Sequence, residues 1–224
     1  MNDIPEDNIV SLQDSLEIIN SQIGCSDSLA CNYDVNKLYD DGSCTYPDLG
    51  FDCDGNITAE IGDVMEGGYL FYIDETGQHG LVAATEDLQG FNEWGCYAQE
   101  VNGADYLEIG YGEQNTYDIV EHCSDIYSAA SMVTAYESGG FIDWYLPSLH
   151  ELLELYNTIG EGGEQYDFNS YGFSNDYYSS SSEYDPDHAY VVGFEGGVIS
   201  PNGNYFSGSS KNYEFVKVRP IRSF

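Results

Sequence analysis

The fold is decided by the stretch Gly139-Gly140-Phe141-Ile142-Asp143-Trp144-Tyr145-Leu146-Pro147-Ser148-Leu149-His150-Glu151-Leu152-Leu153-Glu154-Leu155-Tyr156. Its glycine pair allows a sharp turn, and the Trp-Tyr pair that follows is a large apolar contribution to a core. Pro147 predicts the start of a helix, with Ser148 and Glu151 spaced as in a capping box. Apolar residues then recur every three or four positions, which predicts an amphipathic helix over 148–159. Because no nucleophile stands beside a base here, the stretch indicates a scaffold.

The segments on either side of this helix indicate β structure. Residues 67–74 predict a strand, and residues 80–84 predict its hairpin partner across a short turn. A second helix is predicted over 113–135. Further strand candidates follow the central helix at 177–182, 189–194, 197–199 and 215–221. Helices placed between hairpins predict an α+β fold.

The charge of the chain limits its partners. It has 40 acidic and 5 basic residues, which gives a net charge of −35. No basic patch can release counterions from a phosphate backbone, so we expect no nucleic-acid partner. Anionic membrane surfaces are disfavoured for the same reason. Self-repulsion at this charge weakens a fold in dilute buffer, whereas salt and divalent cations relieve it, which favours a saline, calcium-rich setting such as seawater.

The basic residues are concentrated near the C-terminus. Four of the five fall in the last 14 positions. We expect Lys217 and Arg219 to alternate on one face of a terminal strand and to pair with carboxylates at the edge of the core. No stretch of 18 consecutive apolar residues exists, so the sequence predicts no membrane span.

The cysteines indicate a disulfide framework formed in an oxidising compartment. There are six of them: Cys25, Cys31, Cys44, Cys53, Cys96 and Cys123. The first four permit three connectivities, among which the sequence does not choose. A zinc site would need CxxC pairs or nearby histidines. The N-terminus lacks the features of a secretory signal, so either a leader is missing or the protein leaves its cell by assembly and lysis, as virion proteins do.

Residues 1–23 are expected to contain an N-terminal helix, over 8–23, that anchors or trimerises the chain. Apolar residues at alternating three- and four-residue spacing form the a/d seam of a coiled coil. They are Ile9, Leu12, Leu16, Ile19 and Ile23. The isoleucines favour three strands, although a seam this short needs help from the globular part or a larger assembly. The alternative is an amphipathic helix that packs on its own domain.

Residues 24–60 form a cysteine-rich module without helical or strand periodicity. Hard oxygen ligands cluster around its glycine turns, which predicts a calcium ion (Ca2+) as cofactor. The candidate ligands are Asn32, Asp34, Asp40, Asp41, Asp52, Asp54 and Asn56. Their spacing departs from the EF-hand loop, which has glycine sixth and a bidentate glutamate last. The alternative is that these residues form Asx turns and a solvated surface.

This module resembles a short cysteine-rich module of extracellular proteins from marine bacteria, where it is often repeated in tandem. The resemblance rests on the run GCSDSLACNYD and on the segment DDGSCTYP. One copy covers about residues 24–56. The resemblance implies an extracellular location.

Segments along residues 61–224 resemble the family named for the C-terminal domain of collagen-like adhesins, the Lcl C-terminal domain family. They are GGYLFYID and GQHGLVAA in 67–84, EWGC at 93–96, IGYGEQNT at 109–116, DWYLPS at 143–148, YSSS at 178–181 and VRPIRSF at 218–224. The resemblance implies a C-type-lectin-like fold in surface or secreted proteins, often trimeric, some of which adhere to sulfated polysaccharides. This chain departs from the family in its charge of −35, which opposes binding of a polyanion without a local basic spot or a calcium bridge.

The implied fold is also that of formylglycine-generating enzymes, whose catalysis needs reactive cysteines. The comparison implies that Cys96 and Cys123 pair structurally here, so no activity carries over. Other catalytic patterns are weak: with 40 acids, a glycosidase-like pair arises by chance, and the serines at 179–182 lack a GxSxG elbow and are expected to end a strand. The four histidines are scattered without metal-ligand spacing. We therefore expect no enzyme activity.

Loops rich in tyrosine and asparagine are the remaining candidate for function. They cover 97–111, 166–178 and 202–213. Tyrosine and asparagine offer rigid stacking planes and adaptable hydrogen bonds, which suit sugar or protein recognition on a rigid scaffold. The candidate ligand-binding residues are Tyr106, Tyr111, Tyr171 and Asn204. The alternative is ordinary surface with local packing.

These features together predict a non-enzymatic extracellular structural or adhesion protein displayed in several copies. Its lectin-like head, 61–224, would contact a glycan or protein receptor on a cell surface. The expected setting is the surface of a marine virion, as a phage fibre, decoration or receptor-binding component. The alternative is a secreted or filament-forming surface adhesin of a marine bacterium, and a carbohydrate-active enzyme is the third reading.

Overall fold

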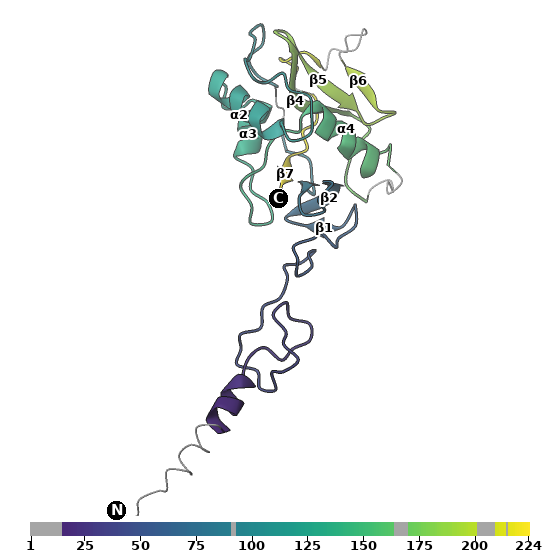
Figure 1. Cartoon of the computed structure of the whole chain (residues 1–224). Coiled ribbons are helices and arrows are strands. Elements are labelled where there is room, and N and C mark those ends of the chain that lie inside the picture. The colour runs from purple at the N-terminus through teal and green to yellow at the C-terminus, as the bar shows by residue number, and fades with distance from the viewer. Residues whose placement is uncertain (1–14, 91–92, 164–169, 201–208, 214) are drawn as a thin grey trace, which may run out of the picture. The chain divides into compact units, whose positions relative to one another are not determined.

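The computed structural model describes residues 15–90, 93–163, 170–200, 209–213 and 215–224. The chain divides into two compact units, Met1–Thr58 and Ala59–Phe224 (Figure 1). The larger unit combines helices with two antiparallel sheets, so the predicted α+β class is confirmed. Among the described residues, no helix is long and apolar enough to cross a bilayer.

The smaller unit is held together mainly by disulfides. Residues 15–21 are helical, and most of the rest, up to Thr58, is turn and irregular structure. Bonds between Cys25 and Cys44 and between Cys31 and Cys53 cross-link it. Among residues 15–58, the buried apolar side chains are those of Cys25 and Ala30. Cross-links therefore take the place of a hydrophobic core, as is usual in small cysteine-rich modules.

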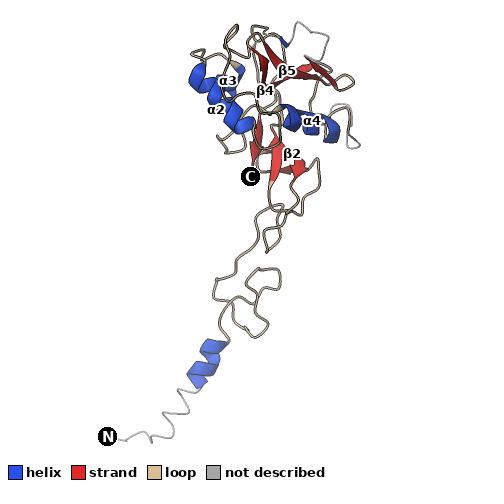
Figure 2. Ribbon diagram, turned by 45° about the horizontal axis from the view of Figure 1, so that its top comes forward, coloured by secondary structure: helices blue, strands red, loops and turns tan. Residues whose placement is uncertain are grey.

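Two separate sheets make up the β structure of the larger unit (Figure 2). The first has the order β1-β2-β3-β7, with β1 at Val64–Met65, β2 at Gly68–Ile73, β3 at Gly80–Ala83 and β7 at Ile221–Ser223. The second has the order β4-β5-β6, with β4 at Tyr177–Asp185, β5 at His188–Gly193 and β6 at Val198–Ser200. The predicted hairpin is confirmed, since β2 and β3 pair antiparallel with Leu70 opposite Val82.

Helix α4, at Leu149–Thr158, lies between the two sheets and contacts strands of both (Figure 1). The predicted capping box is confirmed: the Ser148 hydroxyl accepts the N–H of Glu151, and the Glu151 carboxylate accepts the N–H of Ser148. Ser148, rather than Pro147, is the N-cap. The core around α4 is aromatic and aliphatic, and it includes Phe71, Leu152, Leu155, Tyr178, Phe194 and Ile221. Trp144 and Tyr145 are buried, as predicted.

The prediction of one helix over 113–135 is wrong. Two helices occupy that range, α2 at Gly112–His122 and α3 at Ala129–Thr134. The chain is extended at Cys123, which is bonded to Cys96, and Ser128 then caps α3 by accepting the N–H of Ser131. A tertiary cross-link and a second N-cap therefore override the helical pattern.

The strand predicted over 177–182 is confirmed as β4, but its predicted end is wrong, because β4 continues to Asp185, and the last predicted strand is wrong in position. Serines 179–182 lie inside β4 and are buried, rather than ending a strand. The C-terminal strand is Ile221–Ser223 and not 215–221. The segment before it changes partners: Lys217 exchanges backbone bonds with β4, whereas the carbonyl of Pro220 accepts the N–H of Ala84 beside β3. Because this segment joins one sheet to the other, it forms only isolated bridges on the way.

Three basic residues near the C-terminus form ion pairs inside the larger unit. Arg219 is buried against Asp87, and it also donates to the carbonyls of Tyr171 and Gly172. Lys211 is buried against Glu183. Arg222 pairs with Asp143, at 2.5 Å, and with Glu66. The predicted pairing of Arg219 with a carboxylate is thus confirmed, but its predicted place in a strand is wrong, because β7 begins at Ile221. Among the described residues Lys217 forms no ion pair, and it does not share a regular strand with Arg219, so the prediction for Lys217 is wrong.

Candidate ligand-binding surface

The loop before α2 carries two exposed tyrosines that stack on each other. The ring centroids of Tyr106 and Tyr111 are 4.6 Å apart, and the rings are inclined by 21°. Their side chains remain 45% and 41% exposed. Stacked rings that keep this much surface in water present a flat aromatic face to solvent.

The first half of this loop is fixed by buried polar side chains. The carbonyl of Tyr106 accepts from the amide nitrogen of Asn115 and from the hydroxyl of Ser182, each at 2.7 Å. Asn115 lies on α2 and Ser182 on β4, and neither side chain is exposed. Ser182 also accepts the N–H of Leu149 at the start of α4. The buried serines of β4 therefore join the loop to the helix.

The second half of the loop rests on the N-terminus of α4. The carbonyl of Leu107 accepts the N–H of His150, and the carbonyl of Glu108 accepts the hydroxyl of Ser148, each at 2.8 Å. The N–H of Gly110 donates to Glu151 Oε1, also at 2.8 Å. Every one of these bonds uses a backbone group of the loop, so its exposed side chains sit on a fixed support.

Glu151 is the buried carboxylate at the centre of this support. Burial raises its pKa, while hydrogen bonds from the N–H groups of Ser148, Gly110 and Gly112 lower it in part. The close approach of the loop needs glycine at 112, because a Cβ there would collide with the Glu151 carboxylate and the carbonyl of Leu146. The buried Glu151 side chain thus holds the backbone of the loop and of the start of α4 through hydrogen bonds.

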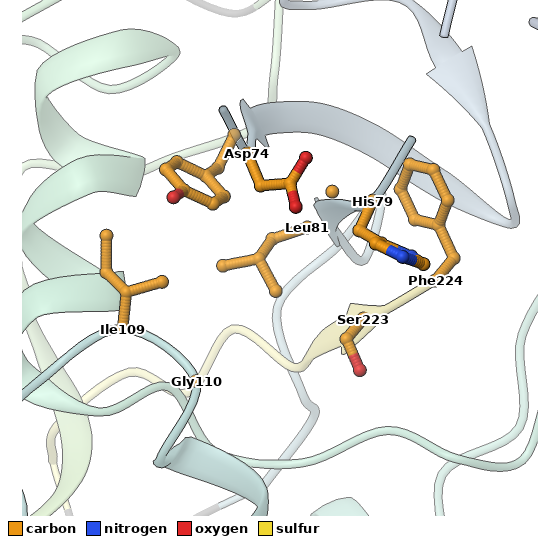
Figure 3. Close-up of a pocket in the computed structure, with 9 residues that line it drawn as sticks. Asp74, His79, Leu81, Ile109, Gly110, Ser223 and Phe224 are labelled. Carbon is orange, nitrogen blue, oxygen red and sulfur yellow. The ribbon is translucent and has the colours of Figure 1, made fainter. Parts of the chain in front are cut away.

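An open hollow of about 430 Å³ lies beside this loop (Figure 3). We name it the hairpin hollow, because Asp74, His79 and Leu81 of the β2–β3 hairpin line it together with Ile109 of the loop. Phe224, after β7, completes an apolar lining around Leu81, while Asp74 and His79 place polar groups beside it (Figure 3). An apolar hollow with a few polar groups is the usual form of a small-molecule site.

Two more hollows lie along α2. The helix hollow, of about 260 Å³, is lined on α2 by Glu113, Tyr117 and Val120, and on the facing segment by residues that include Ile142 and Trp144. The linking hollow, of about 500 Å³, is lined by Gly110, Glu113, Gln114 and Tyr117. Residues 113, 117 and 120 follow the three- and four-residue spacing of one helical face, so α2 presents this lining as a stripe.

Tyr145 is a buried phenol that lines the helix hollow. Burial, together with the nearby Glu151 and Glu113 carboxylates, raises the pKa of Tyr145. The phenol therefore stays protonated.

The other predicted ligand residues lie apart from the stacked pair. Tyr171 packs edge-on against Tyr69, with ring centroids 5.0 Å apart, and its carbonyl accepts from Arg219. Its hydroxyl sits where a side chain at Gly62 would otherwise be. The role visible for Tyr171 is packing. Asn204 lies outside the described residues.

The predicted calcium ligands form turns in this structure. Asp34, Asp40, Asp41 and Asp52 each accept a backbone N–H two residues further on, which is the Asx-turn alternative. The side chain of Asn32 bonds the backbone of Ser43 and Thr45. The Asn56 side chain donates to the Asp52 carboxylate. Asp54 lies in the same turn, where its N–H donates to Asp52. Calcium binding stays a prediction.

The predicted seam is exposed where the structure describes it. Leu16 and Ile19 are 58% and 48% exposed, and Ile23 is also exposed. Ile9 and Leu12 lie outside the described residues. Oligomerisation stays a prediction.

Three ionisable side chains come close together on α2. Within the described residues, Asp118, Glu121 and His122 place ligand atoms within 4.8 Å of one another. All three belong to one exposed turn. The Asp118 carboxylate accepts from Gln114, and a His122 ring nitrogen bonds the carbonyl of Asp118. Asp118 and His122 are thus hydrogen-bonded within the helix.

Sequence reasoning missed most of this surface. Ser182 belonged to a serine run already noted, and Glu151 to a noted capping box, but neither pattern reveals which distant loop the side chain holds. Asn115, Leu81 and Ile109 carry no sequence signal for a site. All six cysteines are paired, as predicted, in a framework that includes the bond between Cys96 and Cys123.

No protein-family model matches the chain, and no curated protein matches it either.

Proposed function

We propose that this chain is a non-enzymatic extracellular adhesion protein whose larger unit recognises a glycan. The proposal includes a C-type-lectin-like fold for that unit, as in the Lcl C-terminal domain family. Two antiparallel sheets with few helices, and the disulfide between Cys96 and Cys123, are compatible with it. The three disulfides fit a secreted or extracellular protein.

One observation carries the proposal: the backbone of an exposed aromatic loop is hydrogen-bonded to buried polar groups. Tyr106 and Tyr111 face solvent, while Asn115, Ser182 and Glu151 fix the backbone beneath them. A loop that is ordered before binding loses little conformational entropy when a ligand arrives. Stacked aromatic faces suit the apolar faces of sugar rings, as in recognition loops rich in tyrosine.

The buried acid supports binding rather than catalysis. Glu151 has the raised pKa expected of a general acid. However, its two oxygens accept the N–H groups of Gly110 and Ser148, and the side chain has no exposed surface. A group fixed in this way has a structural task, since a general acid must reach the proton it transfers.

The positions of the basic residues favour a glycan without sulfate groups. Lys211, Arg219 and Arg222 are all buried in ion pairs with carboxylates. They are therefore occupied within the fold and are poorly placed to hold a polyanion, which the net charge of −35 would also repel.

The proposed setting is the surface of a virion, as a fibre, decoration or receptor-binding component. The second candidate is a secreted or filament-forming surface adhesin of a marine bacterium. In both settings the exposed side chains of Leu16 and Ile19 would pack against other copies, as a trimer or a larger assembly. Sedimentation of the chain with and without residues 1–23 tests this, because a monomer in both would reject the seam.

A glycan array probed with the full chain in about 0.5 M NaCl tests the function, since this salt screens non-specific charge effects. We expect binding to a limited group of glycans, weakened about tenfold by Tyr106→Ala or Tyr111→Ala, the size of the loss of one stacking contact. Tyr127→Ala is the matched control, because Tyr127 is exposed but lies elsewhere. Absence of any bound glycan, or equal loss in all three variants, would reject the proposal.

A further inference from the structure

The hairpin hollow and the two hollows along α2 share lining residues and are therefore adjacent, and we name the three together the groove. The hairpin hollow and the linking hollow share Gly110, and the linking hollow and the helix hollow share Glu113 and Tyr117. The groove therefore runs from the β2–β3 turn, past the loop, and along the exposed face of α2, which suits an extended ligand.

The groove alternates apolar faces with carboxylates. Leu81 and Phe224 line one end, Tyr117 the middle, and Ile142 the other end. A carboxylate accompanies each part: Asp74 in the hairpin hollow, Glu113 in the linking hollow and Asp143 in the helix hollow. The basic side chains beside them are His79 in the turn and Arg222, which is already paired with Asp143. The groove thus places carboxylates beside apolar side chains.

We propose that this groove binds a strand of amino sugars with free amines. This deepens the proposed function, on which it rests, by naming the class of glycan. Sugar rings would pack on the apolar faces, and protonated amines would form charge-assisted hydrogen bonds with Asp74 and Glu113. The chain's negative charge steers such a cation toward the groove. A basic peptide shares the charge, but each sugar ring also offers an apolar face to the side chains of Leu81, Tyr117 and Phe224 that line the groove beside these carboxylates.

Calorimetric titration of the full chain tests the proposal with a fully deacetylated β-1,4-glucosamine hexasaccharide under mildly acidic conditions. The salt is about 0.5 M NaCl, at which the Debye length is only about 4 Å. We expect binding of this probe, and at least about tenfold weaker binding of the N-acetylated hexasaccharide, which lacks the charge. Hexalysine is expected to bind more weakly than the amino-sugar probe.

Two variants locate the site. Glu113→Gln is expected to weaken binding of the amino-sugar probe about tenfold, which is the worth of one hydrogen bond to a charged group. The matched control, Glu195→Gln, removes the same charge from an exposed position in the turn between β5 and β6, outside the three hollows, and is expected to leave binding unchanged. Because both residues are exposed, neither substitution threatens the fold.

The outcomes separate this inference from the function on which it rests. Equal binding of the acetylated and deacetylated probes, or equal loss in both variants, would overturn the amino-sugar site and leave glycan binding standing. Tighter binding of hexalysine would overturn it in favour of a basic peptide. No glycan bound here or on the array would overturn both.

Discussion

Glu151 joins segments that are far apart in the sequence. Its carboxylate accepts the N–H of Ser148 in the capping box and that of Gly110, 41 residues earlier. The tight contact with Gly112 leaves no room for a side chain there. One acid therefore caps α4 and also positions the loop that carries Tyr111. Leaving buried N–H groups without an acceptor costs about 1–3 kcal/mol for each group.

Substitution of Glu151 gives a prediction for stability and pH. Glu151→Ala is expected to lower the free energy of unfolding by about 2–3 kcal/mol, because the N–H groups of Ser148 and Gly110 lose their acceptor. Glu151→Gln keeps an acceptor and is expected to cost less. Urea denaturation across a range of pH measures both.

The pH dependence has a definite sign. Burial raises the pKa of Glu151 above its ordinary value of 4.5, so the folded state holds this proton more tightly than the unfolded state does. Stability of the native protein relative to Glu151→Gln is therefore greatest below pH 4.5 and falls as pH rises through the folded-state pKa. A stability difference independent of pH would contradict the assigned burial.

At the scale of elements, β4 connects its own sheet with α4 and with the loop that carries Tyr106. The backbone of β4 pairs with β5 and with Lys217, while its serine hydroxyls point to other elements. Ser181 donates to the carbonyl of Pro147, and Ser182 donates to that of Tyr106. The serines inside this buried strand thus serve as hydrogen-bond donors to carbonyls of other segments.

Ser182→Ala is expected to destabilise the protein by about 1–2 kcal/mol, because the carbonyl of Tyr106 and the N–H of Leu149 each lose a bond. It should also weaken ligand binding by loosening the loop. Ser179→Ala is the control, since that hydroxyl makes only a 3.4 Å contact with the neighbouring carbonyl. Chemical denaturation compares the two, and equal losses would show that the loop is not held through Ser182.

The turns of the smaller unit are the elements on which the calcium prediction depends. Asp52 accepts the N–H groups of Asp54 and Asn56 with one oxygen, and a hydrogen bond from the Asn56 side chain is the main cause of its lowered pKa. Calcium is expected to raise the thermal midpoint of the full chain. At a calcium concentration one hundred times Kd, the free energy of unfolding would increase by about 2.7 kcal/mol. A midpoint equal to that in magnesium at the same ionic strength would reject a structural calcium ion.

At the scale of the molecule, charge and cross-links act in opposite directions. A net charge of −35 opposes compaction, whereas three disulfides restrict the unfolded chain. Three of the five basic side chains are buried in ion pairs inside the larger unit. Much of the surface is therefore left with uncompensated acids, which only the solvent can screen.

The thermal midpoint is expected to rise steadily between about 10 mM and 1 M NaCl, as the Debye length falls from about 30 to 3 Å. Differential scanning calorimetry measures the change. Titration with sucrose at matched osmolality separates screening from general exclusion of the cosolute. A midpoint that responds equally to sucrose and salt would contradict self-repulsion as the main cost.

Local patterns in the sequence were enough to predict the central helix with its capping box, the β2–β3 hairpin, the buried Trp144 and Tyr145, and a disulfide framework. Each of these depends on neighbours in the chain or on composition. Only the tertiary structure decided the connectivity of the first four cysteines, the break between α2 and α3, the partners of the buried cations and the groove. Arg219 and Asp87, for instance, are separated by 132 residues. Such pairs depend on how the elements pack in three dimensions, a property that no local periodicity encodes.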